Sequence, residues 1–512
     1  MKKLNWPLIM ILAACAFLYF FQLGTPTAWD QDEGQMFASS LEMVKSGEYL
    51  TPHLNGEVYF HKPPLYAWLT ALLFRLFGFT EFFGRFWAAA FALMGVCLVH
   101  RFGKELYGER AGLLAALILG TSPLYIVLAK MALVDNLLTL MIFSALFFFF
   151  LGYRAPAEKK WFYLMYVSMA LGVMTKGPLG VLVPSASIFL FLLFERKIGF
   201  IKEMELLRGI PVFLLVASPW FIIETIREGR YFLEMIFGQF LFAIYMSPMQ
   251  QHEGPFYYYI FVILLGLLPW SALFVPALIK RPDRLMLSLF LVMLGIFSTA
   301  STKVPGYFLP AFPAMAVITG AYLDRVFSGE NRAGYYFGLI FTPVILALAI
   351  WGTFNADIPA GFAQALVYLQ TLLLVALAGF FLAFLFSFMK PQPKWSVPVW
   401  ALTIVVFFVG LIQWLLPYAE NFKPSRDLAL AMKGKEHIAF YRTWLPPSLV
   451  FYLNRQQYPA FLRDIREEAD LNGFLSRKGS AAYLPMEEGK KLRFPRKTLK
   501  TKAGYVIIEK RR

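Results

Sequence analysis

Three acidic residues, Asp30, Asp32 and Glu33, lie within four positions directly after the first apolar segment of the chain. An ionised side chain at a membrane boundary is costly unless a charged or polar group uses it. An aspartate with an ordinary pKa of about 3.9 is ionised at neutral pH, and it could accept a proton from an acceptor or orient it. Capping of the following helix is the alternative explanation. Asp30 is the weaker candidate, because it precedes that helix.

A second unusual motif has the sequence Tyr59-Phe60-His61-Lys62-Pro63-Pro64. An interfacial aromatic belt with a snorkelling lysine would explain it without any function. We favour a binding role, in which Lys62 pairs with a phosphate beside Tyr59 and the two prolines stiffen the backbone.

Three more ionisable residues, Asp135, Lys176 and Lys303, lie at the edges of apolar segments. Asp135 begins such a segment, where it could cap the helix, contact an acceptor or bind a metal. Lys176 precedes Gly177-Pro178, and such breaks end helices, so each lysine could simply mark a loop. Two lysine loops on one face would also suit an anionic ligand such as a lipid phosphate.

Histidines offer a weaker signal. His61 and His252 are the candidate ligands of a divalent ion such as Zn²⁺, Mg²⁺ or Mn²⁺, although a histidine in a loop is usually just solvated. No other cofactor is expected, because the chain has neither a Walker pattern nor a glycine loop that cradles phosphates. The two cysteines, Cys15 and Cys97, lie in predicted helices and support neither a disulfide framework nor a metal cluster.

The composition identifies the elements that must position these residues. Hydrophobic residues make up 59% of the chain and charged residues only 16%, which is typical of a polytopic α-helical membrane protein. The net charge of +16 does not predict nucleic-acid binding. Much of the basic excess lies in short loops between apolar segments, where it orients the chain and contacts lipid headgroups.

Apolar segments that reach, or nearly reach, the length of about 20 residues needed to span a bilayer predict about 13 transmembrane helices. These segments are 6–23, 84–101, 111–128, 135–153, 161–175, 179–194, 209–226, 256–278, 284–300, 306–324, 334–352, 366–389 and 396–417. Segment 64–78 is shorter. If it does not span, the basic loops all face the cytoplasm, so we predict an interfacial or re-entrant helix there.

The same topology places the candidate residues on the external face and predicts two domains. Residues 1–417 form the transmembrane domain, with external loops 24–83 and 227–255. Residues 418–512 are richer in charge and contain short alternating apolar runs. They predict a small α/β domain outside the cytoplasm.

Taken in order, these motifs resemble a known family. Asp32-Glu33, the Tyr59-to-Pro64 motif, Asp135, Thr175-Lys176-Gly177-Pro178, Ser218-Pro219-Trp220 and Lys303 with Tyr307 resemble the GT-C superfamily of lipid-linked-sugar glycosyltransferases. The branch that it resembles most is the lipid A aminoarabinose transferases, within the dolichyl-phosphate-mannose protein mannosyltransferase-like group. The resemblance covers about residues 5–320.

The resemblance implies an inverting glycosyltransferase of a bacterial inner membrane. Its donor would be a polyprenyl-phosphate-linked sugar, and its acceptor would be lipid A or lipopolysaccharide core at the periplasmic face. Residue by residue, Asp32 matches the acid at the reaction centre and Asp135 the second acid. Tyr59, Lys62 and Tyr307 match contacts to the donor phosphate, which Lys176 and Lys303 would join. His252 matches a histidine that can bind a metal.

Two positions depart from the aminoarabinose branch. His61 stands where glutamate is common, and no arginine closely follows His252. The sugar therefore stays open between aminoarabinose, galacturonic acid and a hexose. A protein O-mannosyltransferase-like enzyme acting on Ser or Thr is the alternative within the superfamily. A transporter, from another class, would scatter charges through the midplane, and a lipid-binding scaffold would not require Asp32 beside Lys62.

Overall fold

The computed structural model describes residues 5–236, 238, 253–280, 282–330, 332–355, 362–389, 396–456 and 462–511. Their contacts divide the chain into two compact units that do not follow chain order. Unit 1 contains Met1–Phe21, His61–Leu65 and Ala88–Leu415. Unit 2 contains Gln22–Phe60, Tyr66–Trp87 and Leu416–Arg512.

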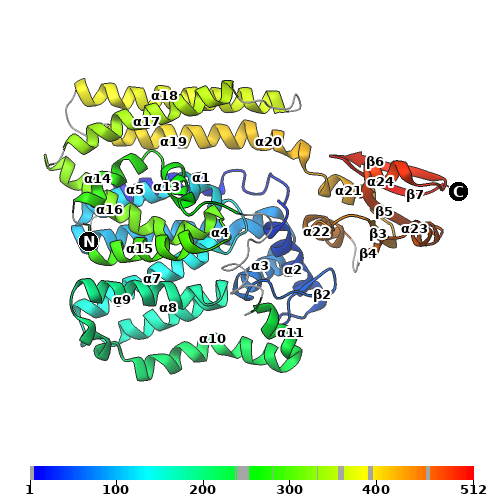
Figure 1. Ribbon diagram of the computed structural model, residues 1–512, viewed down its shortest axis with the longest axis horizontal. Helices are drawn as coiled ribbons and strands as arrows, with labels where there is room; N and C mark the ends of the chain where they lie inside the picture. The colour runs from blue at the N-terminus through cyan, green and yellow to red at the C-terminus, as the bar shows by residue number, and fades with distance from the viewer. Residues whose placement is uncertain are drawn as a thin grey trace. The chain divides into compact units, whose positions relative to one another are not determined.

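Unit 1 is built from helices throughout the part that the structure describes. Helix α7 packs against α8, α8 against α9 and α10, and α18 lies side by side with α17 and α19 (Figure 1). The elements are α1 (Trp6–Phe20), α4 (Glu81–Tyr107, from Ala88 onward), α5 (Glu109–Gly120), α6 (Pro123–Ala129), α7 (Asp135–Arg154), α8 (Lys160–Lys176), α9 (Leu179–Phe194), η1 (Ile198–Met204), α10 (Leu206–Glu228), α11 (Arg230–Leu233), α13 (Tyr258–Gly266), α14 (Ser271–Ile279), α15 (Arg284–Thr299), η3 (Pro305–Ala311), α16 (Phe312–Phe327), α17 (Arg332–Phe354), α18 (Ala363–Met389), α19 (Ser396–Gly410) and η6 (Leu411–Leu415).

Several of these helices can cross a membrane. Within the described residues, seven helices are long and apolar enough, or nine if each of two bent pairs is one span. The chain is thus a polytopic helical membrane protein, and the predicted number of about 13 spans stays a prediction. The pairs α5/α6 and α13/α14 bend by 63° and 113° where the sequence predicted straight spans. Proline at the first residue of α6 and at Pro269, between α13 and α14, accounts for these breaks.

Unit 2 combines helices with a five-stranded sheet of order β4-β3-β5-β7-β6 (Figure 1). Strand β3 pairs in parallel with β4 and β5, and β7 pairs antiparallel with β5 and β6. The elements are α2 (Asp32–Ser46), β1 (His53–Leu54), β2 (Glu57–Val58), α3 (Leu65–Phe77, from Tyr66 onward), the first turns of α4, α20 (Leu416–Ala419), η7 (Glu420–Phe422), α21 (Ser425–Ala431), β3 (His437–Tyr441), α22 (Pro447–Gln456), β4 (Arg463–Ile465), α23 (Glu468–Leu475), β5 (Ser480–Pro485), α24 (Met486–Lys491), β6 (Arg496–Lys502) and β7 (Tyr505–Lys510).

The apolar runs of the C-terminal segment form the centre of this sheet. Ala439, Ala482 and Ile508, from β3, β5 and β7, are fully buried in one cluster. Helix α3, which covers most of segment 64–78, has only 13 residues. That is too short for a span of about 20 residues.

Helix α2 joins the N-terminal part of unit 2 to its C-terminal part. It has two acids in its first turn and ends at Gly47, whose φ of 77° permits the left-handed cap. Its buried face packs against α22, where the rings of Phe37 and Phe451 lie 5.1 Å apart. A methyl group at Gly34 would lie 2.7 Å from the backbone nitrogen of Ser448, so only glycine permits this close approach. Residues 22–60 and the C-terminal segment therefore fold as one body.

Candidate functional site

Unit 1 brings together three of the predicted residues, Asp135, Lys176 and Tyr307. The Nζ of Lys176 donates to Oδ1 of Asp135 over 2.6 Å. The same ammonium lies 4.3 Å from the ring centroid of Tyr307, within the range of a cation–π contact. Three elements, α7, α8 and η3, thus place a carboxylate, an ammonium group and a tyrosine ring in one cluster.

The local sequence explains why the two charges meet. Helix α8 ends at Lys176 because Gly177 follows with a φ of 66°, and α7 begins at Asp135. A cation at a helix C-terminus and an anion at a helix N-terminus are each stabilised by the helix dipole. Capping alone does not account for Asp135, because its carboxylate is engaged by Lys176 from a neighbouring helix.

The surroundings of this ion pair are largely closed to solvent. The side chains of Lys176 and Asp135 are 14% and 10% exposed. On α7, the amide of Asn136 and the hydroxyl of Thr139 are buried, and neither forms a hydrogen bond within the described part of the chain. Native proteins rarely leave buried polar groups unsatisfied, so this first part of α7 carries hydrogen-bonding capacity that the described residues do not use.

Lys303 has a different environment from Lys176. Its Nζ donates to the carbonyl oxygens of Phe297 and Ser298 over 2.9 and 2.7 Å, at the last turn of α15. Its side chain is buried, and the ammonium lies 5.6 Å from the ring centroid of Tyr259. These contacts give Lys303 a role as a helix cap, and its part in phosphate binding stays a prediction.

In unit 2, Asp32 is the first residue of α2 and is exposed, whereas its neighbour Glu33 is buried. Tyr59 follows the β1–β2 hairpin, and its backbone N–H donates to the carbonyl of Pro52 over 2.8 Å. Burial, and then the charge of Asp32, raise the pKa of Tyr59, so the two side chains interact electrostatically and the phenol stays a hydrogen-bond donor.

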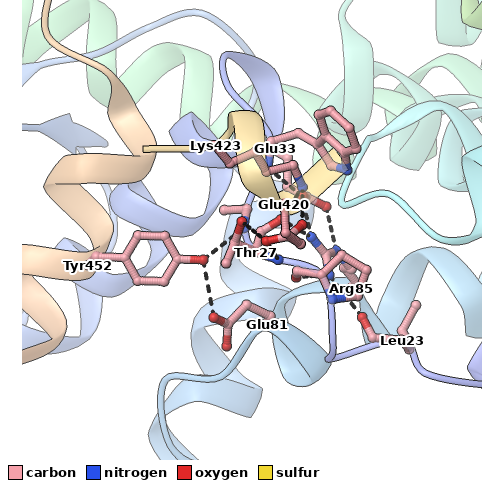
Figure 2. Close-up of polar contacts among 11 residues, drawn as sticks. Leu23, Thr27, Glu33, Glu81, Arg85, Glu420, Lys423 and Tyr452 are labelled. Carbon is pink, nitrogen blue, oxygen red and sulfur yellow. Dashed lines mark hydrogen bonds and ion pairs between the residues drawn. The ribbon is translucent and has the colours of Figure 1, made fainter. Parts of the chain in front are cut away.

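Sequence reasoning missed the arginine that fixes the start of α2. Arg85 donates to Glu33 from Nε over 2.8 Å and from Nη2 over 2.7 Å, and the pair is almost fully buried. Its other bonds go to the carbonyls of Leu23, Pro26 and Thr27, which uses all five N–H groups of the guanidinium (Figure 2). The sequence did contain a signal for this residue, because an arginine inside the predicted span 84–101 indicates a buried partner.

The remaining predicted residues are His61, Lys62 and His252. His61 and Lys62 are half-buried in unit 1, and the chain passes between the units at the bond from Phe60 to His61. His252 lies outside the described residues. Among the residues that are described, no three His, Cys, Asp or Glu side chains are grouped as metal ligands. The metal site with His61 and His252 as ligands therefore stays a prediction.

Known proteins resemble this chain along most of its length. Residues 61–223 match the family model described as dolichyl-phosphate-mannose-protein mannosyltransferase. An uncharacterised protein of Aquifex aeolicus is 30% identical, over 94% of this chain and 92% of its own. The undecaprenyl phosphate-alpha-4-amino-4-deoxy-L-arabinose arabinosyl transferase of Aeromonas salmonicida is 27% identical, over 95% of this chain and 96% of its own.

A solved structure shows the same fold. ArnT from Cupriavidus metallidurans, crystallised with undecaprenyl phosphate, superposes with a TM-score of 0.86 and covers 99% of this chain and 98% of its own, at 22% identity. The fold, the family model and the full-length relatives all agree with the motifs read from the sequence. The chain therefore belongs to the GT-C superfamily of lipid-linked-sugar glycosyltransferases and is a multi-pass membrane enzyme that resembles the arabinosyl transferases.

Proposed function

We propose that this enzyme transfers a sugar, with inversion, from a polyprenyl phosphate to lipid A or its core at the periplasmic face of a bacterial inner membrane. The full-length relative from Aeromonas salmonicida, named for undecaprenyl phosphate-linked aminoarabinose, supports the donor class. The related fold that was solved with undecaprenyl phosphate supports the same class.

The cluster of Asp135, Lys176 and Tyr307 carries the proposal. When a sugar leaves a polyprenyl phosphate, the phosphate changes from a diester to a monoester and gains negative charge. A lysine held in a largely dry site stabilises that charge as it develops in the transition state. Asp135 keeps the ammonium in place before the donor binds, and the Tyr307 ring supports it from one face.

Asp32 would act on the acceptor. An acceptor oxygen attacks the anomeric carbon on the face opposite the phosphate, the bond from carbon to phosphate oxygen breaks, and polyprenyl phosphate leaves. If the acceptor is a hydroxyl group, its proton passes to the Asp32 carboxylate. If the acceptor is a phosphate of lipid A, no proton moves and Asp32 orients the attacking group. The family resemblance also assigns Lys62 and Tyr59 to contacts with the donor phosphate.

The test is transfer by the purified protein. Polyprenyl phosphates carrying aminoarabinose, galacturonic acid or a hexose are each incubated with lipid A or with a Ser/Thr peptide, and mass spectrometry follows both acceptors. We expect one donor to add one sugar residue and to release polyprenyl phosphate. Sugar found only on a Ser/Thr peptide would support the protein O-mannosyltransferase alternative instead. No transfer from any donor to either acceptor would contradict the proposal.

We expect Lys176→Met and Asp135→Asn each to lower transfer by about 10²–10³-fold, as loss of one stabilising group at a developing anion does. The double variant should lose much less than the product of the two, because the residues act as a pair. Single-turnover rates check this. Lys160→Met is the control, since Lys160 pairs with Glu158 at an exposed site. Full activity of Lys176→Met in a folded protein would remove the pair from the mechanism.

A further inference from the structure

We propose that the C-terminal part of unit 2 holds Asp32 in its reactive position. Its residues that contact the segment before Asp32 are then positioning residues for sugar transfer. This inference rests on the proposed function of Asp32. It concerns Glu420, Lys423, Ser448 and Tyr452, none of which the sequence motifs singled out.

The first two of these residues hold Thr27, five positions before Asp32. Glu420 accepts from the backbone N–H and the hydroxyl of Thr27 over 3.2 and 2.6 Å. Lys423 donates to the carbonyl of Thr27 over 2.9 Å and to Glu420 over 2.8 Å (Figure 2). Its ammonium also lies 3.5 Å from the centroid of a Trp29 ring. Thr27 is therefore held through its backbone and its side chain.

Tyr452 holds the next residue. Its hydroxyl accepts from the backbone N–H of Ala28 over 2.8 Å and donates to Oε1 of Glu81 over 3.1 Å (Figure 2). Glu81 begins α4, the helix that also carries Arg85. The hydroxyl thus links the segment before Asp32 to the helix that fixes Glu33.

Ser448 holds Asp30 at the start of α22. Its backbone N–H donates to Oδ1 of Asp30 over 2.9 Å, and its hydroxyl donates to Oδ2 over 2.6 Å. The Oγ of Ser448 also lies 2.6 Å from that of Ser425. Bonds to both oxygens fix the Asp30 carboxyl in one orientation, two residues before Asp32.

Arg85 and Glu33 hold the same segment as well. Arg85 holds Leu23, Pro26 and Thr27 by their carbonyls, and Glu33 accepts from the N–H of Trp29 over 2.9 Å. Every residue from Thr27 to Asp30 is therefore contacted by a side chain of the C-terminal part, while Asp32 itself is exposed. An exposed acid that follows a segment held by so many contacts is a preorganised reactive group.

Conservative variants test this role. Ser448→Ala and Tyr452→Phe each remove one hydroxyl and should lower kcat by about 10–10²-fold with little change in the donor KM, as a displaced reactive group does. Ser448→Thr should restore the rate. Ser476→Ala is the matched control, because it removes a hydroxyl of the same domain that donates to the carbonyl of Asn472 and accepts from Lys510, neither of which belongs to the segment 27–30.

The Asp32→Asn background separates positioning from a structural effect. We expect Ser448→Ala and Tyr452→Phe to add little or no loss to the residual single-turnover rate of Asp32→Asn, because they act through Asp32. Wild-type kcat in both folded variants would overturn the inference, and so would an equal loss with and without Asp32. A fully active Asp32→Asn protein would instead overturn the proposed function, whatever the Ser448 variants do.

Discussion

Replacing Asp32 by asparagine should remove nearly all sugar transfer while the protein stays folded. Asp32 is exposed at the first turn of α2, and the buried charge beside it belongs to Glu33, so the change removes one acid without breaking the ion pair with Arg85. Loss of a general base or orienting carboxylate costs about 10²–10⁴-fold in rate. Mass spectrometry of lipid A measures the loss, and thermal unfolding with gel filtration checks the fold.

A matched control lies in the same unit. Asp464 is also exposed and pairs with Arg466, so Asp464→Asn should keep full transfer activity. Full activity in the Asp32→Asn variant would remove this residue from the mechanism and leave Asp135 as the remaining candidate acid. A loss of transfer in Asp32→Asn but not in Asp464→Asn would therefore support a role for Asp32.

Replacing Arg85 by methionine should destabilise unit 2 more than any other single change described above. The variant leaves the Glu33 carboxylate buried without its cation, and three carbonyls lose a donor. Removal of one partner from a buried pair costs about 3–5 kcal/mol of unfolding free energy. Thermal unfolding of the detergent-solubilised protein, with the yield of folded protein, measures the effect.

The double variant Glu33→Leu/Arg85→Met tests the cause. Without either charge, no uncompensated ion is buried, so we expect part of the stability to return, although the three carbonyls still lack the bonds that Arg85 supplied, and only that of Thr27 keeps Lys423 as a donor. Arg101→Met is the control, because Arg101 forms an exposed pair with Glu105, and such pairs contribute about 1 kcal/mol or less. Equal stability of wild type and Arg85→Met would show that the network does not hold unit 2 together.

Much of the helical fold follows from local sequence. Apolar length predicted a polytopic helical membrane protein, whereas the orientation from the positive-inside rule stays a prediction, and Gly177-Pro178 marked the end of α8 at Lys176. The bends between α5 and α6 and between α13 and α14 were missed, because hydropathy measures apolar length and carries no directional information. The short strands β3 and β7 were visible as alternating apolar runs in the C-terminal segment.

Local sequence also indicated three residues of the candidate site. Asp135, Lys176 and Tyr307 each stood out as an unusual residue at a helix boundary. Their meeting was not predictable, since Asp135 and Lys176 are 41 positions apart and pair only through the packing of α7 on α8. Arg85 was passed over because it lies within a predicted span, and its partner Glu33 is 52 positions away.

The contacts of the C-terminal segment were beyond any local pattern. Thr27 and Glu420 are 393 positions apart, and Ala28 and Tyr452 are 424 apart. Ser448 and Tyr452 are an ordinary serine and tyrosine in the sequence, and nothing in their neighbours indicates a distant partner. Residues of this kind become visible only when the folded chain brings them to the segment they hold.

The division of unit 2 between the two ends of the chain sets an order on biosynthesis. Residues 22–60 and 66–87 leave the ribosome early, whereas residues 416–512, with which they fold, are synthesised only after the helices of unit 1. The contacts from Ser448 and Tyr452 cannot form until almost the whole chain has been made and its helices have entered the membrane. If the C-terminal part positions Asp32 as proposed, a nascent chain that has not yet reached Tyr452 lacks the contacts that hold residues 27–30.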